Sequence, residues 1–127
     1  MIAALLAGAA AALLNVVVYA LASAAGVAFV VQMDPSAPVG PMPAPSFAVG
    51  SVVPALFAGG VLLALDAFSR HPARIFLGVA GAFALLSLGG PATVAGASFG
   101  TRAALMAMHA VAAVTITTLL LRRGRAA

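Results

Sequence analysis

Four long apolar runs, separated by short polar or proline-rich segments, constrain this chain more than any other feature of its sequence. Hydrophobic residues make up 65% of the 127 residues and charged residues 6%. Soluble domains carry roughly 25% charged residues, and a soluble domain of this length would need them to cover its surface. We therefore predict an all-α integral membrane protein, a four-helix bundle that forms a single transmembrane domain over residues 1–127.

The runs have the length of membrane-spanning helices, which need about 20 apolar residues. We expect spans at about residues 2–31, 47–68, 75–95 and 101–121, with a proline-rich outer loop at 32–46. The first run lacks the basic start of a signal peptide and exceeds a signal core in length, so we expect it to be retained. The sequence leaves open whether the third helix continues past Pro91. Residues 75–88 alone would reach only about 21 Å, which argues for continuation.

The placement of the arginines predicts the orientation. Arg70 and Arg74 lie in the central hinge and three arginines lie in the tail at 122–125, whereas Arg102 lies at the opposite end of the spans. By the positive-inside rule, we expect both termini and the hinge in the cytoplasm of a bacterium, with the chain in its plasma (inner) membrane. Because these arginines flank apolar runs, we expect their partners to be the lipid bilayer and its anionic headgroups, with no nucleic acid.

Three polar residues inside the runs form a candidate intramembrane polar site: Asn15, Tyr19 and His109. In antiparallel helices, Asn15 and His109 would lie at similar depth near the midplane and could contact each other. An ionisable residue inside a membrane marks a functional site by default. A neutral imidazole that hydrogen-bonds Asn15 or Tyr19 would serve structure alone. We favour this structural role, because no carboxylate lies at that depth to complete a proton relay.

Asp66, Arg70 and Arg74 form a predicted charge cluster at the inner surface. Asp66 precedes Arg70 by four residues, the favourable order for an ion pair on a helix, and both arginines can reach lipid phosphates. We expect this cluster to anchor the chain; the alternative is a site for an ion or an anionic headgroup. Small residues suited to close helix contact lie in three of the runs: Gly8 and Ala12, Ala55 and Gly59, and Gly78 and Ala82.

The sequence offers few groups for catalysis. It has no cysteine, nucleophile elbow, phosphate loop, paired carboxylates or zinc-ligand spacing. We expect no catalytic residue, no metal and no cofactor. A haem held by two histidines would need a second imidazole at the depth of His109, but His71 lies in the hinge, roughly 18 Å away along the axis. A haem held between the His109 side chains of two copies of the chain stays open as an alternative.

The order of these features carries a family resemblance. An alanine- and leucine-rich first run with Asn15 and Tyr19 is followed by the proline-rich loop, by Asp66 before residues 70–74, and by Met108-His109 in the last run. This order resembles a family of small four-helix bacterial membrane proteins of unknown function, common in actinobacteria. The resemblance implies the architecture and brings no activity with it.

Function is therefore predicted only as a class. We expect a structural or accessory subunit, or a homo-oligomer, without catalysis of its own. One alternative is a small transporter or channel with a polar path near Asn15, Tyr19 and His109. A second alternative is a membrane enzyme or a haem-binding protein.

Overall fold

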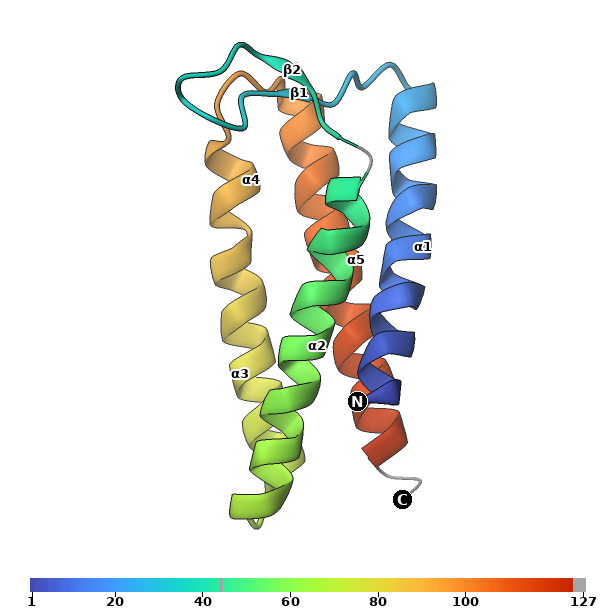
Figure 1. The fold of residues 1–127 in the computed structure, drawn as a ribbon, viewed down its shortest axis with the longest axis vertical. Helices are drawn as coiled ribbons and strands as arrows, with labels where there is room; N and C mark the ends of the chain where they lie inside the picture. The colour runs from blue at the N-terminus through green and yellow to red at the C-terminus, as the bar shows by residue number, and fades with distance from the viewer. Residues whose placement is uncertain (44, 125–127) are drawn as a thin grey trace.

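The computed structural model describes residues 1–43 and 45–124, and its fold is all-α, with 76% of the described residues helical. Four long helical segments form an antiparallel bundle (Figure 1). They are α1 (Ile2–Ala24), α2 (Pro45–Phe68), α3 (Pro72–Ser87) with its continuation α4 (Gly89–Thr93), and α5 (Phe99–Gly124). Within the described residues, each of the four segments is long and apolar enough to cross a membrane. The predicted all-α, four-helix fold is thereby confirmed.

The first helix ends earlier than its apolar run. Gly26 adopts a left-handed φ of 90°, and the amide of Val27 donates to the carbonyl of Ala22 at 3.0 Å, which together form a common helix-ending motif. Beyond this point the chain turns across the end of the bundle. There β1 (Val30–Val31) pairs antiparallel with β2 (Gly40–Pro41). Residues 25–31 thus belong to the connection between α1 and α2 and do not continue the first helix.

The third helical segment continues through Pro91. α4 follows α3 after a single residue, and the two together run from Pro72 to Thr93. Pro91 is the third residue of α4, where its missing N–H would have had no partner inside that helix. The amide of Ala92 donates to the carbonyl of Leu88 at 3.1 Å, which links the two helices across the junction. The continuation gives this segment the length to cross a bilayer.

The start of α1, the end of α5 and the hinge between α2 and α3 lie at one end of the bundle, and the loop with β1 and β2 lies at the other (Figure 1). Arg70, Arg74 and Arg122 therefore lie toward the same end, and Arg102, near the start of α5, lies toward the opposite end. Two parts of the predicted pattern, Arg125 of the tail and Ala44 of the proline-rich loop, lie outside the described residues.

Small residues bring α1 close to α2. A Cβ atom added at Gly59 would lie 2.6 Å from the Cβ of Ala4, and one added at Gly8 would lie 3.0 Å from the Cα of Val52. α3 differs, because Phe76 is its only buried residue in the described part of the chain, and a Cβ added at Gly78 would meet nothing within 4 Å. Close packing therefore joins α1 and α2, whereas α3 leaves space beside its neighbours.

Candidate functional site

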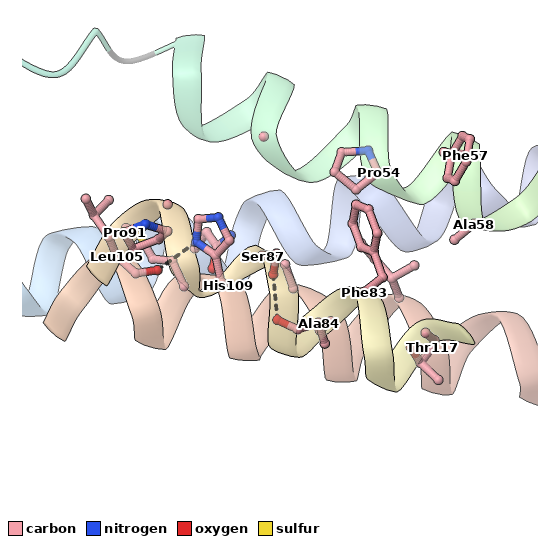
Figure 2. A pocket seen from close by; sticks show the side chains of 18 of the residues that line it. Pro54, Phe57, Ala58, Phe83, Ala84, Ser87, Pro91, Leu105, His109 and Thr117 are labelled. Atoms are coloured by element: carbon pink, nitrogen blue, oxygen red, sulfur yellow. Dashed lines mark hydrogen bonds between the residues drawn. The ribbon is translucent and has the colours of Figure 1, made fainter. Parts of the chain in front are cut away.

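A cavity of about 640 Å³ lies between α2, α3, α4 and α5, and Asn15 of α1 contributes to its wall. Its lining is mostly apolar, with five polar side chains among the described residues: Asn15, Ser46, Ser87, His109 and Thr117. No charged side chain of the described residues lines it. Figure 2 shows side chains of α2, α3, α4 and α5 converging on this space. The cavity lies beside α3, where a Cβ added at Gly78 would meet nothing within 4 Å.

Two aromatic side chains stand where α2 faces α3. The ring centroids of Phe57 and Phe83 are 6.5 Å apart, and both rings line the cavity. Figure 2 shows Phe83 extending from α3 toward Pro54 of α2. Phe57 is 66% exposed and Phe83 is 54% exposed, so these rings form part of the outer surface as well as the cavity wall. The space between α2 and α3 is thus a lateral side of the cavity.

Asn15, which contributes to the cavity wall, carries a buried and unpaired acceptor. Its side chain is 6% exposed, and its Nδ2 donates to the Oγ of Ser51 at 3.1 Å. The Ser51 hydroxyl donates its only hydrogen to the carbonyl of Phe47 at 2.9 Å, so its oxygen must accept from Asn15. This chain of bonds fixes the orientation of the amide. The Oδ1 atom of Asn15 is then buried without a hydrogen-bond partner among the described residues, an arrangement that is rare in folded proteins.

His109 presents a second acceptor. Its Nδ1 lies 2.8 Å from the carbonyl oxygen of Leu105, one turn earlier on α5. A carbonyl can only accept, so Nδ1 carries the hydrogen, and Nε2 of the neutral imidazole carries a lone pair. Figure 2 shows the ring beside Pro91 in the space enclosed by the helices. The structure therefore brings Asn15 and His109 to one cavity, although their hydrogen bonds are made to Ser51 and Leu105.

Tyr19 lies outside this cavity lining. Its ring centroid is 4.7 Å from that of Phe29 and 4.9 Å from that of Phe47, so the three rings form an aromatic cluster between α1, the loop that follows it and the start of α2. Phe29 is 2% exposed and has a left-handed φ of 49°, which is uncommon for a bulky residue. The cluster fixes the chain as it leaves α1, and Tyr19 serves in this packing.

Ser51, the partner of Asn15, was not predicted from the sequence. A serine within the second apolar run was a signal, because a lone amide in the first run needs a polar partner on a neighbouring helix. The cavity was not predicted either, because a cavity depends on the distances between helices.

A comparison with protein families shows to which family this chain is related. A family model described as "Family of unknown function (DUF6069)" matches residues 1–126. The chain belongs to this family. The expectation of a family of unknown function is confirmed, and DUF6069 membership covers all four helices. No curated protein and no solved structure matches the chain.

The charge cluster of this DUF6069 chain lies at the hinge. Asp66, Arg70 and Arg74 are all exposed. α2 ends at Phe68, so Asp66 lies in the helix and Arg70 lies beyond its end. The spacing of four residues therefore does not place these two side chains on one helical face. The arginines remain free to extend toward an adjacent surface.

The described residues of this DUF6069 chain contain no group of three or more His, Cys, Asp or Glu side chains that could hold a metal ion. His71 is exposed in the hinge, whereas His109 lies in the cavity wall. The two histidines of one chain therefore occupy separate environments.

Proposed function

We propose that this protein is a four-pass protein of the bacterial plasma membrane with both termini in the cytoplasm. Its four long apolar helices support insertion. Arg70, Arg74 and Arg122 lie toward the end of the bundle that holds the start of α1 and the end of α5, and Arg102 lies toward the other end. The positive-inside rule assigns the end richer in arginine to the cytoplasm.

Cysteine labelling tests this topology, because the native chain has no cysteine. Met33→Cys places a thiol in the loop, and Ala73→Cys places one next to the hinge; both native side chains are exposed. We expect a membrane-impermeant maleimide to label Met33→Cys in intact cells and Ala73→Cys only after lysis. The reverse pattern would overturn the orientation, and labelling of both sites in intact cells would overturn the four-pass arrangement.

We propose further that the protein binds a lipophilic molecule in its cavity and acts as a non-catalytic accessory protein of the membrane. The cavity carries this proposal. Its volume of about 640 Å³ falls within the range of about 300–1,000 Å³ seen for small-molecule sites. An apolar wall with a few polar groups is also typical of such sites. Its lateral side between Phe57 and Phe83 would face the lipid chains, so a molecule dissolved in the bilayer could enter without crossing water.

Photocrosslinking tests binding directly. A hexadecyl chain that carries a diazirine is incorporated into phosphatidylcholine nanodiscs with the purified protein, and the crosslinked positions are mapped by mass spectrometry. We expect crosslinks at Ala112 and Ala113, which line the cavity. Ala84→Phe should abolish them, because Ala84 also lines the cavity. Ala82→Phe is the matched control on the same helix, because Ala82 is exposed outside the lining. Equal crosslinking in the two variants would refute the proposal.

A transport role is the second candidate. The cavity lining extends from Met42 in the outer loop to Phe76, near the opposite end of the bundle. A site of this length favours movement of a molecule between the two halves of the membrane. Transfer of a fluorescent lipid between leaflets of reconstituted vesicles tests it, with Ala84→Phe expected to slow transfer and Ala82→Phe to leave it unchanged.

A further inference from the structure

We infer that the molecule bound in the cavity is a neutral amphipath whose head group is a hydroxyl that donates a hydrogen bond. This inference rests on the proposed binding function and specifies the ligand. The absence of charged side chains from the described lining favours a neutral molecule, because a buried charge needs a partner of opposite sign. The apolar remainder of the wall suits a hydrocarbon chain.

The polar atoms of the wall show which hydrogen-bonding partner is missing. The Oδ1 atom of Asn15 is buried and lacks a donor among the described residues, although the side chain lines the cavity. The Nε2 atom of His109 is an acceptor in the tautomer that its bond to Leu105 requires. Both groups therefore lack a hydrogen-bond donor, but Oδ1 of Asn15 is covered by surrounding atoms, so Nε2 of His109 is the acceptor that a ligand in the cavity would meet. An ester, ether or ketone without a hydroxyl supplies only acceptors and leaves Nε2 unsatisfied.

The proline of α2 adds a third acceptor. Pro54 has no N–H to donate to the carbonyl of Gly50, four residues earlier, and both residues line the cavity. One hydrogen-bond donor of the cavity wall already has a partner, since the hydroxyl of Ser87 donates to the carbonyl of Ala84 at 2.7 Å. The hydroxyls of Ser46 and Thr117 also line the cavity, and each can donate as well as accept. The imidazole Nε2 and the Gly50 carbonyl can only accept, so in a site without bulk water they favour a ligand that donates.

The orientation of the ligand follows from the same geometry. Asn15 lies on α1 and His109 on α5, while Phe57 and Phe83 stand at the lateral side between α2 and α3. A hydroxyl that donates its single hydrogen to Nε2 of His109 places the attached chain toward the two aromatic rings and the lipid beyond them. Entry would then proceed sideways from the bilayer.

Two probes that differ by one donor test the inference. The protein in phosphatidylcholine nanodiscs is crosslinked with a diazirine-bearing hexadecanol or with the methyl ether of the same molecule, at equal mole fraction. Crosslinks at Ala112 and Ala113 report the cavity, and crosslinks at the exposed residue Ala82 report surrounding lipid. We expect the alcohol to crosslink the cavity about three- to tenfold more than the ether, the gain of about one hydrogen bond.

One variant assigns this preference to the wall. His109→Phe should bring the ratio of alcohol to ether close to one, because it removes the Nε2 acceptor that takes the single hydrogen of the hydroxyl. The Nδ1 bond of His109 is made within its own helix, so this variant removes no hydrogen bond between helices. An unchanged ratio in His109→Phe would overturn the inference. Equal cavity crosslinking by both probes in the native protein would overturn the hydroxyl inference and leave ligand binding intact. Water that satisfies the acceptors would give this result. Absence of cavity crosslinks with either probe would overturn the binding function itself.

Discussion

Gly59 and Gly60 offer a matched test of the contact between α1 and α2. Both glycines lie in α2 at consecutive positions. A Cβ atom at Gly59 would lie 2.6 Å from the Cβ of Ala4, whereas a Cβ at Gly60 would meet nothing within 4 Å. The Cβ of Ala4 belongs to the helix itself and cannot rotate away. Gly59→Ala must therefore push the two helices apart, and Gly60→Ala need not move anything.

The expected magnitudes follow from two opposing effects. Replacing glycine by alanine inside a helix stabilises it by about 1 kcal/mol, a gain that both variants share. Overpacking a close contact costs about 1–3 kcal/mol, a loss that applies to Gly59→Ala alone. We therefore expect Gly60→Ala to be more stable than the native protein by about 1 kcal/mol. Gly59→Ala should lie about 1–3 kcal/mol below Gly60→Ala.

Unfolding in mixed micelles with rising sodium dodecyl sulfate measures the difference. The chain has one tyrosine and no tryptophan, so its fluorescence reports Tyr19 in the aromatic cluster with Phe29 and Phe47. The double variant Ala4→Gly/Gly59→Ala removes the obstructing Cβ and should recover most of the loss. Equal unfolding midpoints for Gly59→Ala and Gly60→Ala would refute the close contact, as would a double variant no more stable than Gly59→Ala.

Three further predictions concern polar and aromatic groups. Asn15→Ala removes the bond to Ser51 and should destabilise the protein by about 0.6–1.7 kcal/mol in the same unfolding assay, with Ser23→Ala, an exposed site, as control. Phe29→Ala should cost about 3 kcal/mol, because the ring is buried, and should change the fluorescence of Tyr19. The Ser36 hydroxyl and then its backbone amide lower the pKa of Asp34 below 3.8. The stabilisation that these hydrogen bonds give to the charged Asp34 carboxylate is complete at pH values above its ordinary pKa. It is lost as the pH falls through the lowered pKa. Ser36→Ala should therefore raise the pKa of Asp34 in a carboxyl-carbon NMR titration, and an unchanged pKa would contradict the assigned cause.

Particular residues show how far prediction from sequence reached. The four helices follow from apolar runs whose length and lack of charge leave few alternatives, and the structure has them. The end of α1 escaped prediction, because residues 25–31 are as apolar as the helix before them. The backbone at Gly26 ends the helix there. The continuation through Pro91 was decided by its place in the first turn of α4.

The candidate site was anticipated only in part. Asn15 and His109 could be selected from the sequence, since polar groups in apolar runs are few. The contacts that surround these two residues could not be predicted from the sequence. The structure pairs Asn15 with Ser51, places Tyr19 among Phe29 and Phe47, and separates Asp66 from Arg70 by the end of α2. Helices that are apolar on all sides carry little periodic signal to show which face points inward.

By itself, the sequence determined the number of helices, their apolar character and the uneven distribution of arginine along the chain, because these properties belong to single segments. Only the tertiary structure decided that α1 packs closely on α2 through Gly59 while α3 leaves a cavity. The reason is physical. Helix separation depends on the side chains of two surfaces at once, and the free oxygen of Asn15 depends on a third residue, Ser51, that orients its amide.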